Sequence, residues 1–234
     1  MKKALIIATV TATVLWGTAV QAGVVIGGTR IIYNGGEKES TIEVRNRDKT
    51  PWLIQSWTDD NGLQGQNKNA PKTPFQVTPS LYKLGAASSD ILHITLTEDT
   101  LPKDKESLYW INIKSIPEVA KAKGNALTIS VNQRFKLIYR PVGLKAPAEA
   151  DYKKITFNVQ GKKIRVNNPT PYWFTFYSLK AGGKAVNTAG KMVPPKSQIN
   201  YVLPSGVTSN EVSWQVINDY GGNSSTLAAK AKTK

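Results

Sequence analysis

The sequence predicts an all-β protein made of sandwiches, because apolar and polar residues alternate in short runs separated by turn signals. Alternation with a period of two puts one face of a strand in a core and the other in water. Such runs occupy residues 41–45, 91–96, 108–113 and 163–166. Turn clusters occupy residues 34–36, 59–62 and 181–183. Helical periodicity is missing over any useful length, which favours packed sheets over helical folds.

The first residues predict a secretory signal peptide. Lys2 and Lys3 precede an apolar run over residues 4–16, and a small-residue cleavage site ends at Ala22. Such a run rises about 20 Å as a helix, whereas a membrane span must cross about 30 Å of hydrocarbon. We therefore expect cleavage of residues 1–22 and export to the periplasm or beyond. No later segment is a candidate span, so we expect no membrane insertion.

The mature chain is predicted to form two domains. Removing the 22-residue leader leaves 212 of the 234 residues, which suits two domains of ordinary size. A long strand over about residues 125–140 ends at Pro141, and Pro147 follows before the next strand pattern. Because proline cannot continue a central ladder, we place a linker there. The predicted domains are 23–144 and 148–234. Residues 228–234 are predicted to fray.

Residue types argue against an enzyme. The chain has no cysteine, which excludes thiol catalysis, cysteine-ligated zinc and iron–sulfur clusters. The only histidine, His93, lies in an alternating strand without a partner motif. Residues 59–62 lack the oxygen spacing and terminal glutamate of an EF-hand and are interpreted as a turn, and no glycine pair continues into a phosphate loop. We expect no cofactor, no metal and no small-molecule substrate.

The charge is strongly basic. The formal net charge is +15, and loss of Lys2 and Lys3 with the leader leaves +13. An exported chain meets little nucleic acid, so acidic protein surfaces or carboxylates are the better partners. A solvated basic surface accounts for most of the 31 Lys and Arg residues.

Short motifs mark the mature chain from end to end. In order they are GTRIIY at 28–33, QSW at 55–57, TP at 78–79, LPKDKESLYWIN at 101–112, IP at 116–117, FKLIYRP at 135–141, NPTPY at 168–172 and INDYGG at 217–222. In this order and spacing they resemble the periplasmic pilus (fimbrial) assembly chaperones of the chaperone-usher pathway. The short segment between Pro117 and Asn125 resembles the short-loop branch of that family. His93, in place of an expected arginine, and residues 84–86, without the usual proline, depart from the pattern.

The resemblance implies a fold and a function. It implies two immunoglobulin-like β-sandwich domains at an angle, with a cleft between them that receives the end of a pilus subunit. It implies a periplasmic chaperone of a Gram-negative bacterium that binds, folds and caps subunits by donor-strand complementation. The subunits would then be delivered to an outer-membrane usher, and no enzymatic activity is expected.

The resemblance also assigns site residues. Arg30 and Lys136 match two cleft cations that anchor the C-terminal carboxylate of the subunit, a contact that charge-assisted hydrogen bonds would strengthen. The plain alternative is two ordinary surface cations. Glu106, Arg140 and Asp219 match a charged trio that joins the domains, so their implied role is orientation rather than catalysis.

Leu127, Ile129 and Val131 match the apolar positions of the donor strand. Alternation alone does not separate this role from burial in the protein's own core, and that alternative stays open. Lys136 is an even position whereas the donor residues are odd, so a flat strand would put them on opposite faces. A bulge, a twist or a two-sided role must reconcile them.

Other classes of function compete with a chaperone. Six Trp and nine Tyr suggest a secreted carbohydrate-binding adhesin-like sandwich, although strand-like positions of most Trp residues favour core packing. A pilus subunit is a third possibility, but subunits usually have one domain and a disulfide.

Overall fold

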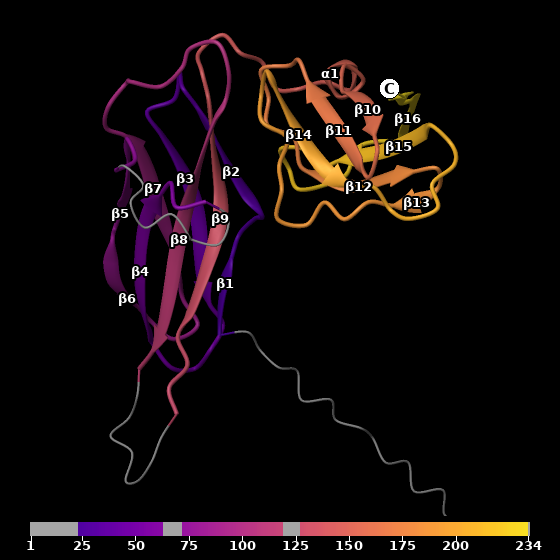
Figure 1. Cartoon of the computed structure of the whole chain (residues 1–234). Helices are drawn as coiled ribbons and strands as arrows, with labels where there is room; N and C mark the ends of the chain where they lie inside the picture. Colours follow the sequence, from indigo (N-terminus) through magenta and orange to yellow (C-terminus); the bar gives the residue numbers. More distant parts are fainter. Residues whose placement is uncertain (1–22, 63–71, 119–126, 234) are drawn as a thin grey trace, which may run out of the picture.

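The computed structural model describes residues 23–62, 72–118 and 127–233. Two β-sandwiches follow one another along the chain and are joined by a short connection (Figure 1). The predicted all-β class with two sandwich domains is confirmed. The only helix in the described ranges is α1 (Glu149–Tyr152), and none there has the length and apolarity of a membrane span. The predicted signal peptide, 1–22, lies outside the described residues.

The first sandwich packs a four-stranded sheet against a five-stranded sheet. The four-stranded sheet has the order β1 (Val24–Ile26), β3 (Glu39–Asn46), β7 (Ser89–Leu96) and β5 (Phe75–Thr78). The five-stranded sheet has the order β2 (Arg30–Asn34), β9 (Val131–Arg140), β8 (Ser107–Pro117), β4 (Trp52–Asp59) and β6 (Leu81–Leu84). Side chains from both sheets form one core between them, including Ile54, Leu92, Ile111 and Leu137.

The chain changes sheets between β1 and β2. β1 pairs with β3, whereas β2 pairs in parallel with β9 in the other sheet. Gly28 between them has φ of +125°, a backbone conformation that a residue with a side chain rarely adopts. Because β2 meets β9 only from Lys136 onward, residues 131–135 of β9 have a ladder partner on the β8 side alone within the described residues.

β9 begins later than its alternating pattern predicts. The expected strand over about residues 125–140 starts at Val131, and residues 127–130 belong to no strand, while 125–126 lie outside the described residues. The last pairing with β8 is between Ser115 and Val131, and in the described part of the chain the following β8 residues pair with β4 alone. Alternation predicts the extended conformation, but a ladder also needs a partner strand.

The second sandwich packs two four-stranded sheets. One has the order β14 (Ser197–Val202), β11 (Lys163–Asn168), β10 (Thr156–Gln160) and β17 (Lys232–Thr233). The other has the order β13 (Lys184–Ala185), β12 (Phe176–Ala181), β15 (Glu211–Val216) and β16 (Leu227–Lys230). Its core contains Phe157, Phe174, Tyr201 and Trp214.

The prediction that residues 228–234 fray is wrong for its described part. β16 pairs with β15, and β17 pairs in parallel with β10, so the C-terminal segment links the two sheets of the second sandwich. Leu227 and Ala231 are buried at either end of β16. Backbone pairing therefore orders a sequence whose alanines and lysines give little strand signal of their own.

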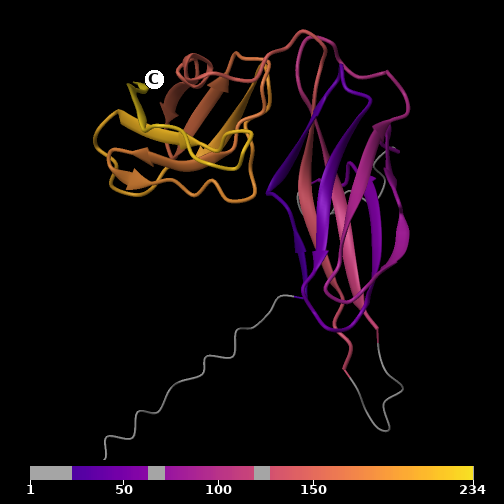
Figure 2. The ribbon, with the colours of Figure 1, turned by 180° about the vertical axis from the view of Figure 1, so that it is seen from behind.

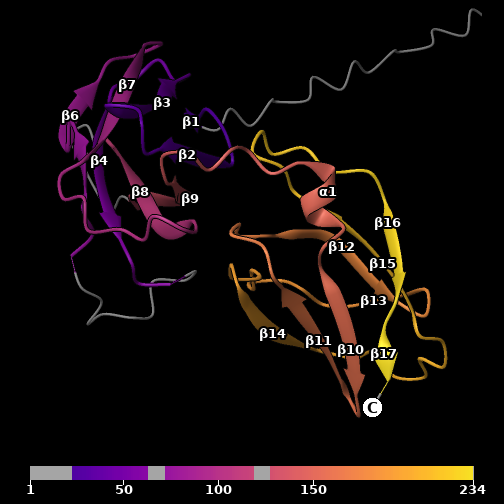
Figure 3. The same cartoon turned by 90° about the horizontal axis from the view of Figure 1, so that it is seen from above.

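The two sandwiches lie side by side and meet near the connection, as the views from behind and from above show (Figures 2 and 3). β2 and β9 lie on the side of the first sandwich that faces the second (Figure 3). A backbone hydrogen bond from Glu106 N to Pro171 O, 2.8 Å long, joins the domains. The candidate site is built where these strands face the second sandwich.

Candidate functional site

Arg30 and Lys136 lie next to each other on one face of the first domain. They are directly opposite in the parallel ladder of β2 and β9, and opposite residues in such a ladder point to the same side. That side faces the second domain, because Arg30 Nη1 donates to the carbonyl oxygen of Ile217 at 3.2 Å and Lys136 Nζ donates to Thr175 Oγ1 at 3.0 Å. Within the described residues, both partners are neutral oxygens.

The surroundings of the two cations disfavour their charge. Burial lowers the pKa of Lys136 to about 8, with a further lowering from the neighbouring Arg30. Burial also lowers the pKa of Arg30, and Asp219 opposes that shift. The Nε atom of Arg30 is buried without a hydrogen-bond partner in the described part of the chain. An incoming anion would relieve the repulsion and supply the missing acceptors, so the pair has the chemistry of a carboxylate site.

The structure brings Glu106, Arg140 and Asp219 together between the domains. Arg140 Nε and Nη2 donate to Glu106 Oε1 at 2.9 and 2.7 Å. Arg140 Nη1 and Nη2 donate to Asp219 Oδ2 and Oδ1 at 2.8 and 3.1 Å. Arg140 and Glu106 belong to the first domain and Asp219 to the second, so one guanidinium bridges two carboxylates across the boundary.

Trp173 extends this contact. Its backbone N–H donates to Glu106 Oε2 at 2.7 Å, and its indole Nε1 donates to Glu106 O at 3.2 Å. The Arg140 guanidinium also lies 5.9 Å from the ring centroid of Tyr172. Burial raises the pKa of Glu106, while Arg140 and the Trp173 amide lower it. Every polar atom of the Glu106 carboxylate thus has a partner, as a buried charge requires.

Leu127, Ile129 and Val131 expose their side chains, with exposed fractions of 87%, 64% and 49%. Of these three, only Val131 belongs to β9, and further along that strand Leu137 and Tyr139 occupy odd positions and are buried in the core of the first domain. The odd positions therefore lie in the core at one end of β9 and at the surface at the other.

The two faces of β9 account for the parity of the predicted residues. Pairing with β8 runs without a shift from Ser107 opposite Tyr139 to Ser115 opposite Val131, so this stretch has no bulge. Even positions, including Lys136 and Arg140, turn towards the second domain, whereas odd positions turn towards the core side. Of the explanations that the sequence leaves open, a two-sided role fits this geometry.

Some partners in the site carry no sequence signal. Thr175 and Trp173 act through a hydroxyl and a backbone amide, and the carbonyl oxygen of Ile217 is common to any residue. Their positions depend on how the two domains pack. The NPTPY and INDYGG motifs adjoin or include these residues in the sequence. They indicate the segments that reach the site but not the individual atoms that act there.

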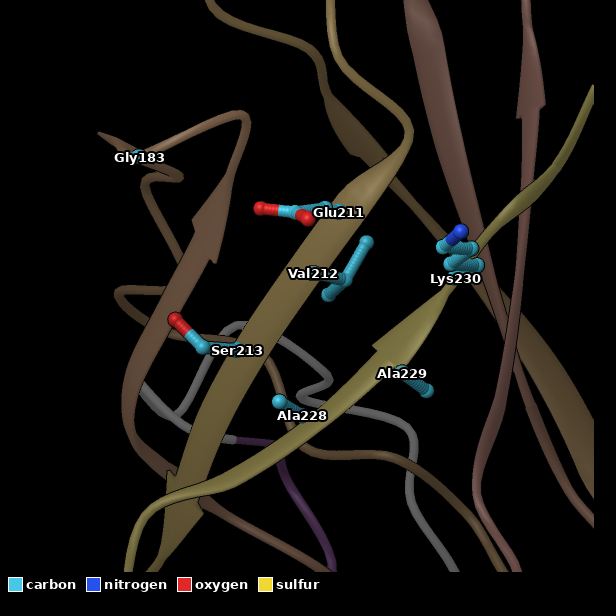
Figure 4. A pocket seen from close by; sticks show the side chains of 7 residues that line it. All are labelled: Gly183, Glu211, Val212, Ser213, Ala228, Ala229 and Lys230. Atoms are coloured by element: carbon cyan, nitrogen blue, oxygen red, sulfur yellow. The ribbon is translucent and has the colours of Figure 1, made fainter.

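The remaining polar features lie elsewhere. His93 on β7 places Nδ1 2.9 Å from Glu39 Oε1 at the surface. No cluster of three or more potential metal ligands is present among the described residues. A hollow of about 430 Å³ in the second domain lies beside β15 and β16 (Figure 4). Its lining consists of Gly183, Glu211, Val212, Ser213, Ala228, Ala229 and Lys230, none of which belongs to the site between the domains.

Comparison with known proteins matches both domains. Residues 23–145 match the family "Pili and flagellar-assembly chaperone, PapD N-terminal domain", and residues 150–228 match "Pili assembly chaperone PapD, C-terminal domain". The chain is 44% identical over 206 residues to the chaperone protein LpfB of Salmonella typhimurium, covering 85% of each chain. It is 39% identical over 225 residues to the probable fimbrial chaperone LpfB of Escherichia coli O157:H7, covering 94% of each.

A solved structure agrees in fold. The complex of the Salmonella enterica SafA pilin with the SafB chaperone contains a chain that matches with a TM-score of 0.79 at 32% identity. The match covers 88% of the present chain and 95% of that chain. Sequence and structure thus agree over both sandwiches.

Proposed function

The chain belongs to the PapD family of pilus-assembly chaperones, and from that premise we propose how its interdomain site captures a subunit. Its function is that of a fimbrial chaperone of the periplasm, and pilus subunits are its partners. We infer that a strand of the subunit adds to the unpaired edge of β9, and that its chain terminus binds Arg30 and Lys136.

One observation carries this proposal. Among the residues that the structure describes, one edge of β9 has no ladder partner at residues 131–135, and this edge ends at Lys136, where β2 begins to pair. An unpaired strand edge offers backbone donors and acceptors to another chain. Exposed Val131 begins this stretch and exposed Ile129 lies just before it, whereas the two cations lie at its other end. An added strand would therefore meet apolar side chains along its length and cations at its terminus.

The geometry also gives the direction of the added strand. A strand whose C-terminus reaches Lys136 must run the same way as β9, from Leu127 towards Lys136. These nine steps span about 30 Å at roughly 3.3 Å per residue, so the last nine or ten residues of the subunit would lie along the site. Burying three apolar donor side chains gains about 1.5–3 kcal/mol each before the costs of association.

The trio of Glu106, Arg140 and Asp219 is proposed to set the angle between the domains. Its partners come from both sandwiches, and all its contacts are charge-assisted. Thr175 and Ile217, which touch the cleft cations, belong to the second domain. Holding the second domain in place therefore also holds the oxygens that surround the carboxylate site.

Three further parts of the proposal rest on family membership and the sequence. Residues 1–22 are a cleavable signal peptide. The chain divides into domains at 23–144 and 148–234. The chaperone passes its subunit to an outer-membrane usher. The competing role of a carbohydrate-binding adhesin is not favoured, because both domains match pilus-assembly chaperone families and the relatives above are named chaperones.

Co-purification from periplasm, with bound proteins identified by mass spectrometry, tests the proposal. We expect the parent protein to retain pilus subunits and Ile129→Asp to lose them. The introduced carboxylate would have to enter the apolar surface of the subunit without a partner for its charge. Ile91→Asp is the matched control, since Ile91 is also an exposed apolar residue of the first domain at 49%. Retention of subunits by folded Ile129→Asp would show that the donor assignment is wrong.

A further inference from the structure

A polar network covers the second face of β9 at the base of the proposed donor segment. Arg134 Nη1 and Nη2 donate to Asp59 Oδ2 and Oδ1 at 3.0 and 2.9 Å, and Nη2 also donates to the carbonyl oxygen of Gly62 at 2.6 Å. The Arg134 and Asp59 side chains are only 18% and 10% exposed. Arg134 and Asp59 therefore form a bidentate, largely desolvated ion pair rather than a surface contact.

Two asparagines complete the network. Asn112 is fully buried and donates through Nδ2 to Asp59 Oδ2 at 2.5 Å. Asn132 Nδ2 donates in turn to Asn112 Oδ1 at 3.2 Å. The side chains thus connect two residues of β9 with one residue of β8 and one of β4. The β4 residue is Asp59, which the sequence pattern indicates only as part of a turn.

The network crosses the sheet away from the unpaired edge. Asp59 lies on β4, two strands from β9, so the Arg134 side chain spans about 10 Å across β8. On the way its guanidinium lies 5.3 Å from the ring centroid of Trp110, the residue directly opposite Lys136. Asn132 and Arg134, which precede Lys136 on this face of β9, are therefore hydrogen-bonded to residues of β8 and β4. Their side chains point away from the unpaired edge, which stays free for an added strand.

Residues 131–135 need such a support. A strand inside a sheet is held by ladders on both sides, whereas this stretch has a ladder to β8 alone within the described residues. Residues 127–130 upstream have no ladder there. Strands held on one side only are prone to fraying and to slipping in register.

We propose that the Arg134–Asp59 pair, with Asn112 and Asn132, is a positioning device that holds the donor end of β9 extended and in register before the subunit arrives. This inference rests on the proposed donor-strand function. It adds residues that belong neither to the proposed carboxylate site nor to the exposed apolar donor positions. If the ordered strand is the binding-competent state, apparent affinity scales with the fraction of chains in which it is ordered. Reducing that fraction to about a tenth lowers affinity about tenfold.

A titration with a peptide of the subunit's C-terminal residues, in carboxylate and amidated forms, tests this role at a temperature where each variant is fully folded by circular dichroism. Arg134→Met should bind both forms about 5- to 30-fold more weakly, because strand order matters to both. Arg134→Lys keeps the positive charge but cannot bond both oxygens of Asp59 at once, so it should give a smaller loss of affinity than Arg134→Met. Arg45→Met is the matched control, since Arg45 pairs with Glu43 on the exposed face of β3.

Hydrogen exchange supplies a readout that a general loss of stability does not move. In the free chaperone, Arg134→Met should speed amide exchange at residues 127–135 while residues 39–46 of β3 stay as in the parent. Unchanged peptide affinity of folded Arg134→Met overturns the inference. A loss of affinity confined to the carboxylate form of the peptide also overturns it, because Arg134 would then be a third anchor cation. If Ile129→Asp binds like the parent in the same titration, the donor-strand function itself fails. If Ile129→Asp loses binding and Arg134→Met does not, only the positioning role is wrong.

Discussion

Arg30 of β2 lies directly opposite Lys136 of β9, and the two cations share the face of the first domain that meets the second. Each is hydrogen-bonded to a neutral oxygen of the second domain, from Ile217 and Thr175. The arrangement costs stability in the free protein, because two charges are partly desolvated side by side. Such a cost is reasonable where binding of an anion recovers it.

Replacing either cation should cripple subunit binding. Arg30→Ala and Lys136→Ala are each expected to lower affinity for a C-terminal subunit peptide about 30-fold to several thousand-fold, as loss of one partner of a desolvated charge pair does. The double variant should lose less than the two effects combined, since both cations hold one carboxylate. Titration with circular dichroism as the folding control measures this, and Lys180→Ala on β12 is the matched control. Unaltered binding by all folded variants would mean that the pair is only surface charge.

Subunit binding should weaken as pH rises through the pKa of Lys136. Burial and Arg30 lower that pKa to about 8 in the free protein, and a bound carboxylate raises it, so the complex holds more protons than the free components above about pH 8. Affinity therefore falls by up to about tenfold per pH unit above that point. Titrations from pH 6.5 to 9.5 check this, with Lys136→Met, which has no titrating group there, as the control. A flat profile in the parent would contradict it.

Removing the Lys136 charge should stabilise the free chaperone. The folded pKa of about 8 lies below the ordinary 10.5, so between these values the unfolded chain binds more protons and stability rises with pH. Below about pH 8 the full penalty of burying the charge is present. Lys136→Met should therefore raise Tm at pH 7, by about 2–4 °C for each kcal/mol recovered, although it loses the bond to Thr175. A Tm that falls at pH 7, or a gain that persists at pH 11, would contradict this.

The sequence predicted those features that depend on local pattern. Alternation indicated the strands, and motifs more than a hundred residues apart identified Arg30 and Lys136 as candidates for one site. The pattern failed at the start of β9 and at the C-terminus, because whether a segment forms a strand depends on its neighbour in space. β17 is ordered by pairing with β10, some seventy residues earlier in the chain.

Those contacts between the domains that no motif residue marks were beyond reach of the sequence for a similar reason. Thr175 and Trp173 become site residues only when the second sandwich packs at one particular angle. Asp59 looked like a turn residue beside Asp60 and Gly62, and its carboxylate is instead paired with Arg134 from a strand 75 residues away. The parity of Lys136 and Ile129 likewise needed the pairing of β8 and β9 before its meaning was clear.

Arg140→Ala should loosen the two domains. Glu106 and Asp219 would then face each other without their shared cation, and losing one member of a buried charged set costs about 3–5 kcal/mol. We expect a lower Tm and a broader distribution of interdomain distances in small-angle scattering. Arg165→Ala, at an exposed arginine of β11, is the control. An Arg140→Ala protein with the Tm and scattering curve of the parent would show that the trio does not hold the domains together.

The register of the captured strand should depend on the cation pair. A carboxylate fixed at Lys136 determines which peptide side chains meet Leu127, Ile129 and Val131, and a shift of one residue turns every side chain to the opposite face. One residue inserted next to the peptide's C-terminal residue should therefore weaken binding more than two inserted residues, which restore the original face. Against Lys136→Ala the difference should shrink, because an unanchored strand can slide by one position. Equal affinity of the parent chaperone for peptides with zero, one and two inserted residues would show that the terminus does not set the register.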